Sequence, residues 1–309
     1  MGSKYSRTAL VIVLCVGILL VSVDAGFSNS TKKHYSHRKY SSAKTKSISG
    51  NLVLRSAAAF VEDQLTGECL VQKKAGAVVP IASITKLMTA MAVLDAGLDL
   101  DEALTIEPED VDTIHHSSSR MPVGTTLTRR DALLLALMSS DNRCAHALGR
   151  TYPGGFEDCV DAMNAKAKSL GLSETHFEDA SGLSGGSVSS ARDLARLVDT
   201  AYQYKLIREF TTTRKATVYS GQHVVEFHNT NHLVQNPSWQ IGLSKTGFTD
   251  AAGRCLVMQA NLAQRPVLIV LLDSQGKMTR IGDANRIKRW LETKSPSQRT
   301  QRGRQYHLG

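Results

Sequence analysis

Cysteine is scarce in this sequence, with 5 residues among 309, and no spacing between them is typical of a zinc site. Cys15 lies in an apolar N-terminal segment, which leaves Cys69, Cys144, Cys159 and Cys255. Four cysteines allow three disulfide connectivities, and the sequence alone does not choose among them. A bridge between Cys144 and Cys159, on successive predicted helices, and buried free thiols are both open alternatives.

A hydrophobic run long enough to cross a bilayer is also missing from the N-terminus. Residues 9–23 are apolar apart from Gly17 and Ser22, whereas a span needs about 20 residues. Lys4 and Arg7 precede this run, and Ala25 follows it as a small residue at a cleavage site. This order predicts a secretory signal peptide over residues 1–25, with an uncleaved anchor as the alternative. Either alternative implies export, to the periplasm or the wall side of the membrane.

Acidic residues are absent from residues 26–49, which hold six Lys or Arg, and residues 286–309 hold seven basic residues against Glu292. Each segment carries a net charge of +6 and residues 1–25 carry +1, so residues 50–285 keep −4 of the total +9. The folded part therefore lacks the basic surface that a nucleic-acid partner requires. We predict one folded domain over residues 50–292, with a basic linker at 26–49 and a basic tail at 293–309, both disordered and weakly attracted to anionic surfaces.

Apolar periodicity indicates the fold class. Apolar-rich runs at 51–61 and 69–74, separated by a polar stretch with Gly67, predict a β-hairpin. Helical spacing predicts four helices in the middle of the chain, at 83–97, 128–138, 156–171 and 190–202, and Cys144 is expected on a further helix after the turn at 139–142. Four strand-like runs and a last helix follow, at 216–219, 223–227, 254–262, 266–272 and 280–291. Strands at both ends around a helical middle predict an α/β (α+β) fold, an antiparallel sheet flanked by helices with a helical sub-domain.

Three short motifs occur in order on these elements. Residues 83–86 are Ser-Ile-Thr-Lys at a helix start, 140–142 are Ser-Asp-Asn in a turn, and 245–247 are Lys-Thr-Gly at the end of a strand. Each is weak alone, and an N-capped helix with a solvated lysine would explain the first. Their order and their places in the predicted structure indicate a single site. In this order they are the signature of penicillin-binding proteins and class A β-lactamases.

Ser83 and Lys86 suit nucleophilic catalysis. Residues at i and i+3 share one helix face, so the amine can accept the hydroxyl proton. The amine must then be neutral, whereas an ordinary lysine titrates near ~10.4. We expect burial and the charge of Lys245 to lower the pKa of Lys86 by about 3, which corresponds to roughly 4 kcal/mol. This chemistry needs no cofactor and no metal.

The second and third motifs are expected to assist the reaction and hold the substrate. Ser140 can relay a proton to the leaving amine, as a third catalytic residue. Asn142 can bind the amide of the substrate. Lys245 and Thr246 can bind a carboxylate.

An oxyanion hole is expected from two backbone N–H groups. Ser83 supplies its own N–H at a helix N-terminus. The second should come from Phe248, on the strand after Gly247. Gly247 has no side chain, so the substrate can lie close to the backbone there, and we expect Gly247 to take part in substrate binding.

Around these motifs the sequence resembles the S11 family of D-alanyl-D-alanine peptidases, most closely its penicillin-binding protein 7 type of D,D-endopeptidase. The resemblance covers about residues 50–292 and includes 80–83 (Pro-Ile-Ala-Ser), 139–143 and 244–249 (Ser-Lys-Thr-Gly-Phe-Thr). It implies a β-lactamase/transpeptidase-like fold and an acyl ester on Ser83. It also implies that peptidoglycan stem peptides are substrates and β-lactams inhibitors. The short chain after Gly247 favours an endopeptidase over the larger carboxypeptidases with their extra β-rich domain.

Other patterns compete with this interpretation. Residues 182–186 (Gly-Leu-Ser-Gly-Gly) match the nucleophile elbow G-x-S-x-G, but a polar stretch precedes them in place of a buried strand, so we predict a flexible loop. His223, His228 and His232 lie in or beside strands without an acidic or cysteine partner, so we interpret them as ordinary surface histidines.

Two alternative functions use the same scaffold. A β-lactamase needs a Glu that activates the deacylating water, usually within Glu-x-x-Leu-Asn, and this pattern is absent between Asn142 and Lys245. A non-catalytic protein that binds peptidoglycan or β-lactams is the other alternative. All the motif residues are present, which favours the peptidase.

Overall fold

The computed structural model describes residues 52–113, 117, 119–220 and 223–294. The predicted signal peptide, the basic linker and all but the first two residues of the basic tail lie outside these ranges. The described helices are η1 (Ala82–Thr85), α1 (Lys86–Asp95), η2 (Pro108–Asp110), α2 (Arg129–Met138), α3 (Asn142–Arg150), α4 (Phe156–Ser169), α5 (Ala191–Ala201), α6 (Lys205–Thr212), η3 (His232–Gln235) and α7 (Thr279–Lys294). The described strands are β1 (Ala58–Asp63), β2 (Cys69–Lys73), β3 (Val79–Pro80), β4 (Ala103–Thr105), β5 (Thr126–Thr128), β6 (Val188–Ser189), β7 (Lys215–Ser220), β8 (His223–His228), β9 (Gln240–Thr249), β10 (Gly253–Leu262) and β11 (Arg265–Ser274).

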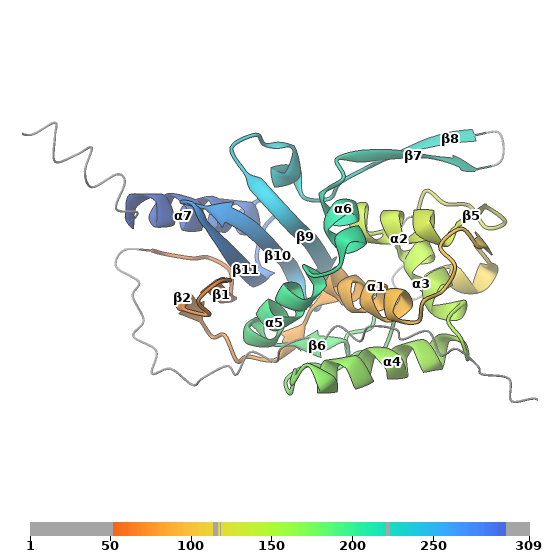
Figure 1. Ribbon diagram of the computed structural model, residues 1–309, viewed down its shortest axis with the longest axis horizontal. Coiled ribbons are helices and arrows are strands. Elements are labelled where there is room, and N and C mark those ends of the chain that lie inside the picture. The colour runs from red at the N-terminus through yellow and green to blue at the C-terminus, as the bar shows by residue number, and fades with distance from the viewer. Residues whose placement is uncertain (1–51, 114–116, 118, 221–222, 295–309) are drawn as a thin grey trace, which may run out of the picture. The chain divides into compact units, whose positions relative to one another are not determined.

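The main sheet has five antiparallel strands in the order β2-β1-β11-β10-β9 (Figure 1). β1 pairs with β11 from Ala58 opposite Leu272 to Asp63 opposite Val267. The first strands of the domain therefore close the sheet beside its last strand, as the sequence predicted. β9 forms the other edge, and an edge strand presents backbone N–H and C=O groups to a molecule that binds beside it.

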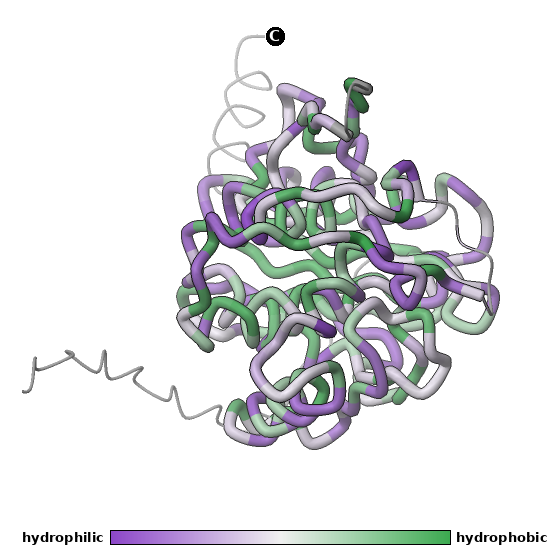
Figure 2. The backbone as a smooth tube through the Cα atoms, turned by 90° about the vertical axis from the view of Figure 1, so that its right-hand side faces the viewer, coloured by the Kyte–Doolittle hydropathy of each residue, from purple (hydrophilic) through white to green (hydrophobic). Residues whose placement is uncertain are grey.

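The sheet is buried on both faces, so its inner strands are almost continuously apolar. In β11, Leu268 and Val270 face a core shared with α1 and α5. The alternate residues Ile269 and Leu271 face a second core that α7 covers. Figure 2 shows hydrophobic stretches of backbone, in green, running through the middle of the described chain. Two cores on opposite faces of one sheet confirm the predicted sheet flanked by helices.

The helical part begins at α1, which is buried from Lys86 to Val93. Gly97 ends this segment with φ +65°, a left-handed conformation that favours glycine. The predicted caps form as well, because Thr128 accepts a hydrogen bond from the Asp131 N–H and Ser190 accepts one from the Asp193 N–H. Among the described residues, no helix is both long and apolar enough to cross a membrane.

Several elements differ from the sequence prediction. α6 was missed because it is only eight residues long, and the length of β9 was missed because Ser244, Lys245 and Thr246 interrupt its apolar pattern. β1 begins at Ala58 and not near residue 51. β7 and β8 are strands as predicted, but they pair with each other in a separate hairpin and not in the main sheet.

The four described cysteines are free thiols. Cys144 lies in α3 and Cys159 in α4, and both are fully buried. The bridge between them is therefore not formed, and buried free thiols are the alternative that the structure selects. Burial raises the pKa of Cys144 well above its ordinary value and that of Cys159 to about 12, which suppresses the reactive thiolate.

Candidate active site

The serine of the first motif lies in η1, the 3₁₀ turn that leads into α1. Two glycines bring other segments against this turn. A Cβ on Gly247 would lie 3.1 Å from the Ser83 nitrogen, and one on Gly182 would lie 1.9 Å from the Ala82 carbonyl oxygen. Only glycine allows this approach, and Gly182 also has φ +79°. β9 and the loop after α4 therefore both pack closely against the backbone at Ala82 and Ser83.

Lys86 lies one turn after Ser83 and is 1% exposed. Its Nζ donates hydrogen bonds to Ser83 Oγ at 2.8 Å, Asn142 Oδ1 at 2.7 Å and the Ser181 carbonyl oxygen at 2.6 Å. These contacts join the first motif, the second motif and the loop after α4 around one amine. Three acceptors match the three donors of an ammonium group.

Burial lowers the pKa of the Lys86 amine to about 8, against the opposing effect of the Asp179 and Asp141 carboxylates. A pKa near 8 leaves a useful fraction of neutral amine at physiological pH. The sequence prediction of a lowered pKa through burial is confirmed. Lys245 was also expected to lower it, and the repulsion between the Lys86 and Lys245 ammonium groups acts on this buried pair as a whole, together with burial.

Lys245 points from β9 toward the second motif and is 1% exposed. Its Nζ donates to Ser140 Oγ at 2.8 Å and to the Thr246 carbonyl oxygen at 3.0 Å. Burial, together with the charges of Lys86 and Arg280, holds the pKa of Lys245 well below its ordinary value. Ser140 has φ +62°, a strained backbone that directs its hydroxyl to this amine.

The remaining motif residues are held by contacts with neighbouring loops. Asn142 begins α3, and its Nδ2 donates to Ser117 Oγ at 2.8 Å while its Oδ1 faces Lys86. The Thr246 hydroxyl donates to Thr230 Oγ1 at 2.6 Å. The structure thus brings all three motifs to one place, where the start of α1, the α2–α3 turn and the end of β9 meet.

The motif search missed several residues that shape this place. Ser117, Ser181 and Thr230 contact motif side chains. Arg280, on α7, donates from Nη1 to the Gly247 carbonyl oxygen at 2.8 Å, and its buried Nε has no hydrogen-bond partner in the described structure. Among the residues around the motifs, only Gly182 could have been noticed in the sequence, because it belongs to a glycine-rich segment.

The glycine-rich segment itself is not a flexible loop, contrary to the sequence prediction. Asp179 accepts five hydrogen bonds from residues 181–187. Gly182 packs against η1, as described above, so the loop forms part of the wall around Ser83. No strand leads into this segment, in agreement with its exclusion as a nucleophile elbow.

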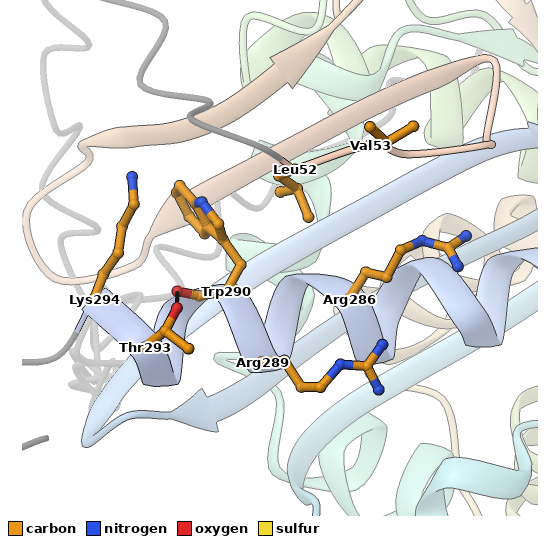
Figure 3. A pocket seen from close by; sticks show the side chains of 7 residues that line it. All are labelled: Leu52, Val53, Arg286, Arg289, Trp290, Thr293 and Lys294. Atoms are coloured by element: carbon orange, nitrogen blue, oxygen red, sulfur yellow. Dashed lines mark hydrogen bonds between the residues drawn. The ribbon is translucent and has the colours of Figure 1, made fainter. Parts of the chain in front are cut away.

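A separate hollow of about 440 Å³ lies on α7, lined by residues 52–53 and by the α7 side chains labelled in Figure 3. It contains none of the motif residues. The chemistry that the motifs predict is therefore assigned to the junction of η1, α3 and β9 and not to this hollow.

Lys245→Ala is expected to lower the second-order rate of Ser83 acylation by about 10- to 150-fold, because a charge-assisted hydrogen bond contributes roughly 1.5–3 kcal/mol. Fluorescent penicillin labelling measures this rate. Lys277→Ala removes an exposed lysine and serves as the control, with an unchanged rate. If Lys245→Ala is acylated at the wild-type rate, Lys245 does not contribute to this step and the third motif has no function in it.

An antiparallel sheet with a helical part, and a Ser-x-x-Lys turn facing a Lys-Thr-Gly strand, define the β-lactamase/transpeptidase-like class of serine enzymes. Within this class, the chain belongs to peptidase family S11, described as D-alanyl-D-alanine carboxypeptidase, whose family model matches residues 43–276. The family resemblance found in the sequence is thereby confirmed.

Relatives and solved structures similar to this chain agree with this assignment. A D-alanyl-D-alanine endopeptidase of Pseudomonas aeruginosa is 50% identical over 242 residues, which are 78% of this chain and 78% of that protein. A D-alanyl-D-alanine endopeptidase of Escherichia coli K12 is 46% identical over 242 residues, with the same two coverages. Among solved structures, a D-alanyl-D-alanine carboxypeptidase of Mycobacterium tuberculosis has a TM-score of 0.72 and 26% identity, and the match covers 82% of this chain and 96% of that one.

Proposed function

We propose that this protein is a serine-type D-alanyl-D-alanine peptidase that cleaves peptidoglycan stem peptides through an acyl ester on Ser83. One observation carries the proposal: the Lys86 amine, with its pKa lowered to about 8, lies 2.8 Å from Ser83 Oγ in a buried site. A neutral amine at this distance is a general base for the serine hydroxyl.

The reaction follows from this pair. Neutral Lys86 accepts the Ser83 proton as Oγ attacks the D-alanyl carbonyl carbon. The Ser83 and Phe248 N–H groups stabilise the oxyanion, and the position of Gly247 beside the Ser83 nitrogen supports this pairing. The C–N bond breaks, and the proton that Lys86 accepted passes through Ser140 to the leaving amine, which leaves Lys86 neutral again. Water then hydrolyses the ester, which returns the proton to Ser83.

Substrate binding is assigned to the edge of β9. A stem peptide lies beside β9 and extends the sheet, as an added strand does. A carboxylate of the substrate is bound by Lys245 and Thr246, and the buried charge of Arg280 behind Gly247 adds to the attraction. Asn142 binds the substrate amide through the side chain that also holds Lys86.

We assign endopeptidase activity on cross-linked peptidoglycan as the main reaction. The two relatives at 50% and 46% identity are endopeptidases, whereas the carboxypeptidase with a similar structure is 26% identical. Endopeptidase and carboxypeptidase reactions attack the same D-alanyl carbonyl, so the balance depends on which leaving group the site accepts.

Digestion of purified sacculi tests this assignment. The enzyme is expected to convert cross-linked dimers to monomers, which chromatography of the muropeptides measures. Trimming of pentapeptides to tetrapeptides, with dimers left intact, would contradict the endopeptidase assignment.

For localisation, we propose an exported enzyme on the periplasmic or wall side of the membrane. Support comes from the charge, apolar run and small-residue order of residues 1–25 and from the location of its substrate in the cell wall. The basic segments at 26–49 and 293–309 would add weak attraction to anionic surfaces. β-Lactams, which carry a carboxylate and a reactive carbonyl, would acylate Ser83 as substrate mimics.

A further inference from the structure

We propose that Asp179 is a positioning residue for the Ser83–Lys86 pair, because it fixes the loop that presents the Ser181 carbonyl group to the Lys86 amine. The inference rests on the proposed function, in which Lys86 accepts the Ser83 proton. Asp179 belongs to none of the three motifs, and its hydrogen bonds go to residues of its own loop and not to Ser83.

The Asp179 carboxylate is the centre of the loop formed by residues 179–187. Its Oδ1 accepts hydrogen bonds from Gly182 N at 2.8 Å and Ser187 Oγ at 3.0 Å. Its Oδ2 accepts three more, from Ser181 Oγ at 2.8 Å, Leu183 N at 2.8 Å and Ser184 N at 3.1 Å. One carboxylate therefore determines the path of the backbone on both sides of Gly182.

The same loop is attached to α1 and η1. Thr89 Oγ1 donates to the Ala180 carbonyl oxygen at 2.7 Å, and Gly182 packs against the Ala82 carbonyl group. The Ser181 carbonyl oxygen lies between these two attachments and accepts from Lys86 Nζ at 2.6 Å. Its position relative to the amine is therefore fixed by the backbone and not by a rotatable side chain.

This carbonyl group determines where the Lys86 lone pair points. A neutral amine has two N–H donors and one lone pair. Asn142 Oδ1 and the Ser181 oxygen accept the two N–H groups, so the lone pair is left facing the hydroxyl of Ser83. If the Ser181 carbonyl group moves, one N–H loses its partner and the lone pair is no longer fixed toward the serine.

Asp179 also acts on the charge of the amine. The charged and titratable groups that face Lys86 are Asp179 from the loop, Asp141 and Cys144 from the start of α3, and Lys245 from β9. Burial lowers the pKa of Lys86, and the Asp179 carboxylate raises it again. Asp179 thus both orients the base and keeps it basic enough to accept a proton.

Two variants separate these effects in the full-length enzyme, with the second-order rate of penicillin acylation measured from pH 6 to pH 9.5. Asp179→Glu keeps the charge but cannot keep all five hydrogen bonds. The acid limb is the fall in rate toward low pH that follows protonation of Lys86. We expect Asp179→Glu to lose roughly 10- to 100-fold at every pH without a shift of this limb, because a small misplacement of a catalytic group has effects of this size. Ser187→Ala removes one donor and keeps the charge, so it should lose less than about tenfold.

Asp179→Asn removes the charge as well. The acid limb is then expected to move to lower pH, so the ratio of variant to wild-type rate rises as the pH falls. A purely structural defect would change the rate by one factor at all pH values. An unmoved limb in Asp179→Asn, or wild-type rates in Asp179→Glu, would overturn the proposal. If Asp179→Asn does not fold, the rate of Asp179→Glu alone decides.

Failure of this proposal is distinct from failure of the proposed function. If Lys86→Met removes the acid limb while Asp179→Asn leaves it in place, only the role of Asp179 is wrong. If Lys86→Met keeps the wild-type pH profile, Lys86 is not the proton acceptor.

Discussion

Ser83→Ala is expected to abolish both penicillin labelling and peptidoglycan cleavage, with a loss on the order of 10⁶ in rate. Alanine cannot form the acyl ester, and the residue is otherwise similar in size, so the η1 turn should persist. The hydroxyl contacts Lys86 Nζ at 2.8 Å, and the remaining acceptors of that amine stay in place. Mass spectrometry of the protein after incubation with a penicillin measures the adduct.

Ser184→Ala is the matched control, since Ser184 is the serine of the competing G-x-S-x-G pattern. It should still form the adduct, because the Ser184 hydroxyl donates to Glu178 and accepts from the Gly186 N–H, and in the described structure it hydrogen-bonds none of the motif residues. A Ser83→Ala protein that still forms the adduct would refute the assignment of the nucleophile. In the wild-type protein, a stable adduct on Ser83 supports the peptidase, rapid turnover of penicillin supports a β-lactamase, and no adduct supports a non-catalytic binding protein.

Lys86→Met should lower the rate of acylation by about 10²- to 10⁴-fold, the usual contribution of a general base. The pH dependence has a definite sign. Lys86 acts as a neutral amine, and its pKa is about 8, so activity rises with pH through this value and falls as the amine becomes protonated below it. In the free wild-type enzyme, kcat/KM should drop about tenfold for each pH unit well below 8.

Lys86→Arg provides a second variant that keeps a positive charge but does not deprotonate. Both variants should lose the limb near pH 8, measured as kcat/KM for a peptide substrate from pH 6 to pH 9.5. A wild-type profile with a comparable rate in Lys86→Arg would show that another group is the base.

Local patterns were sufficient for most of the fold. Helical spacing and the caps at Thr128 and Ser190 predicted α2 and α5, because caps and periodicity depend on residues only a few positions apart. The same reasoning failed at β9. Its polar residues serve the site and not the core, so the apolar alternation that marks a strand is broken at Ser244, Lys245 and Thr246.

The location of the candidate site could likewise be predicted, because a Ser-x-x-Lys pair at a helix start is defined by four consecutive residues. The partners of that pair could not be predicted from the sequence. Ser181 lies 95 positions from Lys86 and contributes a backbone carbonyl group, which has no side-chain signature in a sequence. Arg280 reaches Gly247 from α7, across 33 positions.

By itself, then, the sequence determined the fold class and the three motifs, since each is encoded in short-range periodicity or spacing, and it predicted the chemistry of the motif residues. Only the tertiary structure decided that the four described cysteines stay free, that Lys86 and Lys245 are both buried so that their charges oppose each other, and that Asp179 fixes the loop beside Ser83. These features depend on burial and on contacts between distant segments, and both arise only when the helical part packs against the sheet.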